Sequence, residues 1–200
     1  MVTLPPWASV SSPSLFSAAC YHVRSAEISD LSQLSDVLTN SFYPPSGWRR
    51  WCYPLLRLGI YEDLKQRLQN TQRHYRCLTA IATHPTHQEV LVGTVEMSCR
   101  RYSLWTFNQP PQIYLSNLAV REDCRRRGVA RRLLEAAEKQ ALTWGFRAIY
   151  LHVMADNMQA RLLYQQAGYR VQRVDTTPWA LILPQPQRLL LKKVISPQAS

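Results

Sequence analysis

A short basic turn, Arg125 to Ala130, lies between an apolar run and an amphipathic segment. The apolar run, 113–120, is typical of a strand, and 131–144 has the apolar spacing of a helix. Gly128 lets backbone N–H groups point outward, and the start of the helix adds partial positive charge. Six arginines between 121 and 132 oppose only two acidic side chains. The turn is therefore a candidate anion site that suits a pyrophosphate, although a basic turn with a cap glycine would have the same pattern.

The turn needs a strand before it and a helix after it, and the upstream chain offers further elements of both kinds. Apolar periodicity and turn residues predict a strand at 22–26, a helix at 31–42, a helical region at 47–68, and a hairpin of strands at 76–82 and 90–99. Ser29 is expected to cap the first helix, and Pro44-Pro45 to end it. The second helical region contains Pro54 and Gly59, where we expect a break.

Downstream of the turn, the chain alternates between strand and helix. Strands are predicted at 148–153, 169–174 and 188–195. Between the first two of these, Asn157 is a suitable N-cap for a helix that Gly168 ends. Hairpin strands followed by β-α-β-α-β elements predict a mixed α/β fold with helices that flank one sheet.

Length and composition favour a single globular domain. The 200 residues suffice for one core, and a hydrophobic fraction of 46% is ordinary for such a domain. We expect that domain to span 21–200, after a flexible tail at 1–20 that carries no charged side chain. No apolar run approaches the roughly 20 residues of a membrane-spanning helix, so no membrane span is expected.

Net charge indicates the kind of partner, and cysteine usage indicates the state of the thiols. The net charge is +11, which favours an anionic partner such as a phosphorylated cofactor or a nucleic acid. The five cysteines are scattered and include no Cys-x-x-Cys pair. We therefore expect reduced thiols, no disulfide framework and no metal site.

Two stretches in the second half of the chain carry a more specific signal. The basic turn contains Arg125, Gly128 and Ala130 in the pattern Arg/Gln-x-x-Gly-x-Gly/Ala. A second stretch has the pattern Asn-x-x-Ala-x-x-x-Tyr…Gly-Phe/Tyr at Asn157, Ala160, Leu163-Tyr164 and Ala167-Gly168-Tyr169. Together they resemble the paired signatures of the GNAT family of N-acetyltransferases, and the likeness extends over about residues 22 to 195. It implies the GNAT fold, a central, mostly antiparallel sheet that is splayed at the cofactor site and flanked by helices.

The resemblance also implies that acetyl-CoA is the acetyl donor. Its pantetheine arm would lie along the backbone of Leu118, Ala119 and Val120. Its pyrophosphate would be held by the turn, whose implied cofactor-binding residues are Arg125, Arg126, Arg127, Gly128, Val129, Ala130 and Arg131. Asn157 and Ala160 would contact the cofactor from the second motif. Tyr164 would protonate the departing thiolate, which a neutral phenol can do, and the alternative is a helix core residue.

The acceptor amine must lose a proton before it attacks, so a base is needed. Histone-type members of the family have a glutamate at the position that aligns with Tyr114, and this chain has no acid there. Tyr114 together with His152 is similar to one group of protein N-terminal acetyltransferases, in which tyrosine and histidine act through water as the base. Imidazole titrates near neutral pH, which suits that task, whereas the alternative for His152 is a neutral core residue. Glu96 is a reserve base, either facing a cleft or, by default, lying on a solvent face.

The N-terminal region adds a looser likeness. Arg24-Ser25-Ala26-Glu27-Ile28-Ser29-Asp30 and Asn40-Ser41-Phe42-Tyr43-Pro44 resemble segments of plastid and cyanobacterial GNAT proteins, which are linked to acetylation of protein N-termini and lysines. The chain has no long basic transit sequence. We therefore expect a bacterial, cyanobacterium-like cytoplasm rather than a plastid.

The prediction is an N-acetyltransferase that moves an acetyl group directly from acetyl-CoA to a primary amine, most simply a protein N-terminal α-amine or a lysine ε-amine. A small-molecule amine such as a polyamine is the alternative acceptor. Two non-enzymatic alternatives are an acetyl-CoA sensor and a nucleic-acid-binding module, although no zinc-finger or RNA-recognition signature occurs. A P-loop enzyme is excluded because no Gly-Lys-Ser/Thr follows the glycine. The oligomeric state is left open.

Overall fold

The computed structural model describes residues 21–43, 49–70, 72–83, 89–100, 110–175 and 187–196. The predicted tail at 1–20 lies outside them. The strands are β1 (Tyr21–Ser25), β2 (Tyr75–Thr83), β3 (Glu89–Arg100), β4 (Gln112–Val120), β5 (Ala148–Met154), β6 (Arg170–Asp175) and β7 (Arg188–Val194). The helices are α1 (Leu31–Phe42), α2 (Arg49–Gln69), α3 (Val129–Thr143) and α4 (Met158–Gln166), with 3₁₀ turns at Ile28–Asp30 and Glu122–Cys124.

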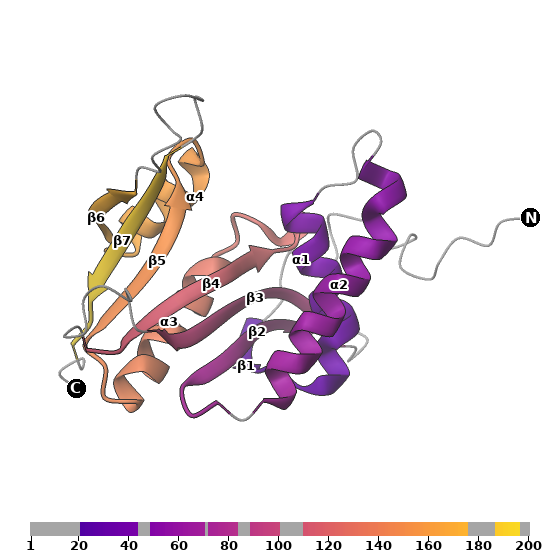
Figure 1. The fold of residues 1–200 in the computed structure, drawn as a ribbon, viewed down its shortest axis with the longest axis horizontal. Coiled ribbons are helices and arrows are strands. Elements are labelled where there is room, and N and C mark those ends of the chain that lie inside the picture. Colours follow the sequence, from indigo (N-terminus) through magenta and orange to yellow (C-terminus); the bar gives the residue numbers. More distant parts are fainter. Residues whose placement is uncertain are drawn as a thin grey trace, which may run out of the picture.

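One sheet organises the described residues, with the strand order β1-β2-β3-β4-β5-β7-β6. Every neighbouring pair is antiparallel except β4 and β5, which are parallel. Figure 1 shows α1 and α2 on one face of the first four strands and α3 on the other. The predicted mixed α/β, mostly antiparallel fold with flanking helices is therefore confirmed.

Apolar side chains form a core on each face of the sheet. On one face Leu133 and Ala137 of α3 are fully buried against a large cluster that includes Ile113 of β4. On the other face Leu34 of α1 and Leu64 of α2 pack with residues of β2 and β3. The alternation of side chains along the strands explains this division, because successive residues point to opposite faces.

The parallel pair β4–β5 is the place where the sheet opens. The two strands pair only from Ile113 opposite Ile149 to Leu115 opposite Leu151. Beyond this point they diverge, as Figure 1 shows. The splayed sheet that the family resemblance implied is thus present, and no described strand pairs with the backbone of β4 after Leu115 on the side of β5.

Two sequence predictions about the first helices are wrong. α2 continues through the exposed Pro54 and Gly59, and the burial of Leu64 in its second half outweighs their low helix propensity. Ser29 does not cap α1 but lies in the 3₁₀ turn before it. Asp30 is buried there and accepts hydrogen bonds from the Arg24 guanidinium at 2.7 and 2.9 Å. A buried carboxylate must keep its charged partner, so this ion pair sets the start of the helix.

Gly93 of β3 allows α3 to approach the sheet closely. A Cβ at this position would lie 3.0 Å from the carbonyl oxygen of Ala119 and 3.2 Å from side-chain atoms of Val129 and Leu133. We expect Gly93→Ala to lower the free energy of unfolding by about 1 to 3 kcal/mol, as overpacked cores do. Urea unfolding followed by circular dichroism measures this change.

The matched control is Gly59→Ala in α2, where an added Cβ meets nothing within 4 Å. Alanine favours a helix interior over glycine by about 1 kcal/mol, so this variant is expected to be as stable as the parent or slightly more stable. Equal losses in the two variants would show that α3 does not depend on the space at Gly93.

Candidate functional site

An irregularity in β4 lies at the mouth of the splay. Ser116 pairs with Glu96 and Ala119 pairs with Thr94, so two residues of β4 stand opposite one residue of β3. Asn117, one of the two, has a φ of 52°, in the left-handed region that few residues other than glycine and asparagine adopt. This is the geometry of a β-bulge, which bends the strand and increases its twist. The residues after it, Leu118 to Val120, run away from β5.

The buried Glu96 side chain of β3 binds the bulge residue Asn117. Glu96 is 1% exposed, and it accepts hydrogen bonds from Asn117 Nδ2 at 2.7 Å, Arg67 Nη1 at 2.9 Å and the Tyr75 hydroxyl at 3.0 Å. The default expectation that Glu96 lies on a solvent face is therefore wrong. Alternation alone gave that expectation, because the sequence pattern does not show that α2 covers this face. Arg67 and Tyr75 donate to Oε2 and Asn117 donates to Oε1, so the carboxylate is held by three donors of the fold.

The basic turn leads into α3 as predicted, but the helix begins earlier, at Val129, with Gly128 before it. Arg126 has a φ of 63° and Gly128 a φ of 80°. The first helical hydrogen bond runs from the Arg132 N–H to the Gly128 carbonyl at 3.1 Å. The N–H groups of 129–131 precede that ladder, and no side chain caps the helix. They are donors of the kind that bind anions at helix N-termini.

Arginine side chains of the turn reach the strand that precedes it. The Arg125 Nε donates to the carbonyl oxygen of Val120 at 3.2 Å. Arg121 pairs with Asp123 at 2.8 Å, and Arg131 pairs with Glu135 on the exposed face of α3 at 2.9 Å. The turn is thus tied to the end of β4, so the two predicted parts of the cofactor site are adjacent.

Tyr114 and His152 meet at the point where β4 and β5 separate. The Tyr114 hydroxyl lies 2.7 Å from His152 Nδ1, and the two rings are tilted with centroids 5.6 Å apart. Tyr114 is buried, and the His152 side chain is 9% exposed. Arg100 of β3 lies over the Tyr114 ring, with its guanidinium carbon 4.3 Å from the ring centroid. The structure therefore brings together the two residues that the family resemblance paired.

A third member of this group, Asp175, was not predicted. Its Oδ2 lies 2.7 Å from His152 Nε2, and its Oδ1 accepts from Arg173 Nε at 2.7 Å. Burial alone would raise the pKa of Asp175, but the hydrogen bonds from His152 and Arg173 hold this pKa below its ordinary value. A lone aspartate at the end of a strand has no spacing signal in the sequence, and only the strand order places β6 near β5.

Tyr164 lies on α4, on the face of the sheet opposite to Tyr114 and His152. It is buried, and its ring meets that of Tyr169 edge-on at a centroid distance of 5.9 Å. Burial, together with the charge that Tyr114 would carry if ionised, raises the pKa of Tyr164 to about 12. The hydroxyl is therefore a neutral proton donor across the physiological range.

Asn157 is the N-cap of α4, as predicted, since its Oδ1 accepts from the Ala160 N–H at 3.1 Å. At the other end of the helix Gly168 has a φ of 89°, and the N–H of Tyr169 donates to the carbonyl of Tyr164 at 2.9 Å. These are the two ends that the second motif predicted. The motif residues therefore fix the length and position of the helix that carries Tyr164.

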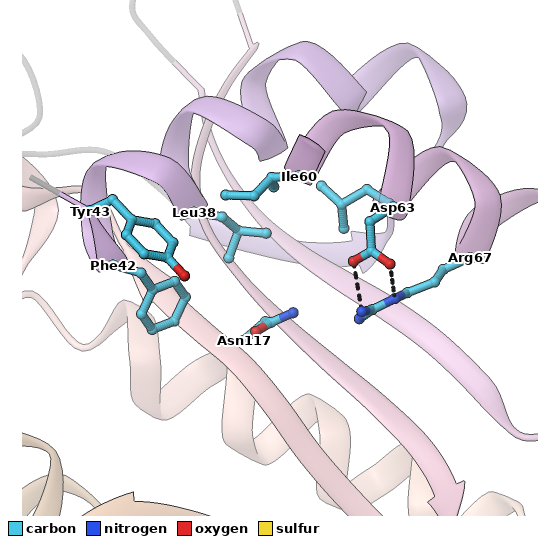
Figure 2. A pocket seen from close by; sticks show the side chains of 8 residues that line it. Leu38, Phe42, Tyr43, Ile60, Asp63, Arg67 and Asn117 are labelled. Atoms are coloured by element: carbon cyan, nitrogen blue, oxygen red, sulfur yellow. Dashed lines mark hydrogen bonds and ion pairs between the residues drawn. The ribbon is translucent and has the colours of Figure 1, made fainter. Parts of the chain in front are cut away.

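A pocket of about 500 Å³ lies between α1, α2 and the β4 bulge. Figure 2 shows Phe42 and Tyr43 at one end and the Asp63–Arg67 ion pair at the other, with Asn117 on the strand below. Its lining residues are Leu38, Phe42, Tyr43, Ile60, Asp63, Leu64, Arg67 and Asn117. The pocket joins apolar and aromatic walls to two charged groups, so it can bind a ligand with both apolar and polar parts.

The described residues also bear on metal binding, membrane crossing and thiol reactivity. No group of three or more histidine, cysteine, aspartate or glutamate side chains is arranged to hold a metal ion. In the same part of the chain, no helix combines the length and apolarity that crossing a membrane requires. Cys77 and Cys124 are buried thiols, and burial raises the pKa of the Cys124 thiol to about 11, well above the range of a reactive thiolate.

Comparison with known proteins agrees with this geometry. The chain is 28% identical over 213 residues to GCN5-related N-acetyltransferase 7, chloroplastic, of Arabidopsis thaliana, a match that covers 92% of this chain and 73% of the relative. Its fold matches PaiA N-acetyltransferase from Thermoplasma acidophilum, in complex with coenzyme A, with a TM-score of 0.66 at 19% identity over 88% of this chain and 99% of that one. It also matches the ribosomal-protein-S18-alanine N-acetyltransferase from Escherichia coli with a TM-score of 0.58 at 17% identity, over 90% and 97% of the two chains. The identities to the two solved structures are low, so these two likenesses show the fold alone.

A family model matches the same part of the chain. The model described as the acetyltransferase (GNAT) family matches residues 43–169, which is more than half of the chain and includes both sequence motifs. The plastid-type relative agrees with the looser likeness of the N-terminal region. This protein therefore belongs to the GNAT family of acetyltransferases.

Proposed function

We propose that the protein transfers an acetyl group directly from acetyl-CoA to a primary amine of another protein, either an N-terminal α-amine or a lysine ε-amine. The observation that carries the proposal is the hydrogen bond of 2.7 Å between Tyr114 and His152 at the opening of the sheet. The Tyr114–His152 pair supplies a base on one side of the splay, and Tyr164 supplies an acid on the other side. Direct acetyl transfer needs both groups.

The donor fits the features of the splay and the turn. On the side of β5, no described strand pairs with β4 beyond Leu115. The backbone of Leu118, Ala119 and Val120 therefore suits the amide-bearing pantetheine arm. The N–H groups of 129–131 suit the pyrophosphate, with Arg125, Arg126 and Arg127 as nearby cations. Asn157 and Ala160 lie at the start of α4 and are proposed to contact the arm. Acetyl-CoA supplies the acetyl group as a thioester, and coenzyme A leaves as a thiolate.

The base acts on the acceptor amine. Tyr114 is proposed to accept the amine proton, directly or through water, as its own hydroxyl proton moves to His152 Nδ1. The proton thus ends on the imidazole, and the amine nitrogen is free to attack the thioester carbonyl. On the opposite side Tyr164 gives its hydroxyl proton to the thiolate as the C–S bond breaks. The nitrogen loses its remaining extra proton to solvent as the amide forms, and solvent also reprotonates Tyr164 and takes the proton from His152.

The pocket between α1, α2 and the bulge is proposed to bind the residue that carries the amine. Its Phe42 and Tyr43 end accommodates an apolar side chain, and Asp63 offers a carboxylate to polar or cationic groups. Among neighbours of the same fold, one is named for a ribosomal-protein alanine and another for an aminoglycoside, so the fold suits a protein and a small-molecule acceptor alike. We propose a reducing compartment, a bacterial cytoplasm or a plastid stroma, for which the chloroplastic relatives and the buried thiols are the support.

Transfer to two peptide sets, followed by mass spectrometry, tests the acceptor. One set has free α-amines and no lysine, and the other has blocked N-termini and one internal lysine. Acetylation of either set, or of both, is expected, and the pattern defines the acceptor class. If neither set reacts while a polyamine or another small amine does, the protein acceptor is wrong. If no amine reacts although acetyl-CoA binds, the protein is a sensor.

The pyrophosphate site is tested by Gly128→Glu. A carboxylate at the start of α3 would repel phosphate groups, so we expect acetyl-CoA affinity to fall at least about tenfold. The matched control is Gly145→Glu at the other end of the same helix. Gly145 has a φ of +85° against +80° for Gly128, and an added Cβ meets nothing within 4 Å at either position. The two variants therefore carry the same backbone strain. Calorimetry that finds equal affinities in both would remove the pyrophosphate assignment.

The acid is tested by Tyr164→Phe. We expect kcat to fall at least about tenfold, with a much smaller change in acetyl-CoA affinity, because the hydroxyl acts only when the thiolate leaves. Tyr169→Phe is the control, since it removes a hydroxyl from the adjacent buried ring. A pKa of about 12 keeps the Tyr164 hydroxyl protonated below that pH, so kcat of the parent is expected to show no loss from its ionisation up to about pH 10. Equal kcat in the two variants contradicts the acid role.

A further inference from the structure

We propose that Asp175 is the positioning residue of the base: it holds His152 in the one tautomer that can take the proton of Tyr114. The inference rests on the proposed function of Tyr114 and His152. Asp175 lies on β6, which is separated from β5 by β7, and its side chain reaches past β7 to His152 Nε2 at 2.7 Å. Three side chains from three strands thus form one hydrogen-bonded line, from Tyr114 through His152 to Asp175.

The tautomer follows from what each group can donate. An ionised carboxylate only accepts hydrogen bonds, so the His152 nitrogen that faces Asp175 must carry the hydrogen. In a neutral imidazole the other nitrogen, Nδ1, is then an acceptor. It can therefore accept the hydroxyl hydrogen of Tyr114, which lies 2.7 Å away. Without a carboxylate at this place, the ring could equally hold its hydrogen on Nδ1 and donate to Tyr114, and the proton path would be blocked.

The same contact stabilises the product of proton transfer. Tyr114 receives the amine proton as it passes its own hydroxyl proton to His152 Nδ1. His152 thereby becomes an imidazolium. No bond forms or breaks at Asp175, which keeps its negative charge throughout. Arg173 fixes the second oxygen of Asp175 at 2.7 Å, so the carboxylate is held in place to face the imidazolium.

The charged and titratable groups around His152 come from several elements. In the described part of the chain they include Tyr114 on β4, Asp175 and Arg173 on β6, Arg100 over the Tyr114 ring, and Lys192 of β7 over the nearby Tyr150 ring. The three cations oppose a further positive charge on His152. Asp175 is the one carboxylate among these groups, so its loss is expected to disfavour the imidazolium.

Kinetics of Asp175→Asn test the proposal with the acceptor that the parent protein uses. We expect kcat to fall about tenfold or more and the acidic limb of the kcat/KM profile to move to lower pH. In the His152→Gln background the same change is expected to have almost no further effect, because the residue acts through His152. Asp175→Glu, which keeps the charge, should leave the acidic limb near its parental position.

Asp36→Asn is the matched control for loss of charge. Asp36 of α1 also pairs with an arginine, Arg57 of α2, and it is part of neither motif. This variant should keep the parental pH profile. If Asp175→Asn lowers the rate equally with and without His152, or leaves the pH profile unmoved, its role is structural only and the proposal is overturned.

The tautomer can also be measured without any turnover. ¹⁵N NMR of the parent protein labelled at its histidines, with the His152→Gln spectrum for assignment, should show a protonated Nε2 and an unprotonated Nδ1 for His152 above neutral pH. The reverse tautomer, or a mixture of the two, overturns the proposal even if acetyl transfer is normal. If no acceptor is found at all, the proposed function fails, and this spectrum still decides the role of Asp175.

Discussion

The buried carboxylate of Glu96 is the interaction on which the architecture of the site depends. A buried charge is costly unless hydrogen-bond donors and an opposite charge offset its desolvation, and here three donors from three elements meet it: Arg67 from α2, Tyr75 from β2 and Asn117 from β4. Asn117 thereby keeps a left-handed conformation in the middle of a strand, where it would otherwise be strained. The Glu96 side chain therefore positions the β4 bulge and α2, which together form walls of the pocket.

The bulge and the splay have complementary effects. The bulge turns the second half of β4 away from the regular ladder, and the short β4–β5 pairing leaves that half without a strand partner on one side. A polar chain can then pair with an edge that already exists, so the protein need not rearrange to expose it. The basic turn follows β4 directly, and its amides and arginines continue the same path. The proposed donor site, the proposed base and the pocket thus share one strand.

Local physics explains which features were predictable. Helix ends at Asn157 and Gly168, the basic turn and the strands depend on residues close together in the sequence, so their patterns indicated them. The meeting of Tyr114 and His152 was expected only because the family resemblance supplied it. The placement of Glu96 and Asp175 could not be predicted, because each depends on which element covers a face or lies beyond a neighbouring strand. The continuity of α2 through Pro54 also depends on tertiary contacts, which outweigh local propensity.

The short pairing between β4 and β5 affects the lifetime of the protein in the cell. Three residue pairs, the Tyr114–His152 hydrogen bond and packing on α3 join the two halves of the sheet there, so a ligand that spans the gap adds contacts that the unfolded chain lacks. A ligand at a hundred times its Kd stabilises the folded state by about 2.7 kcal/mol. Proteases that attack the transiently opened chain would then find fewer targets when acetyl-CoA is plentiful. The lifetime of the enzyme in the cell would follow the supply of its own acetyl donor.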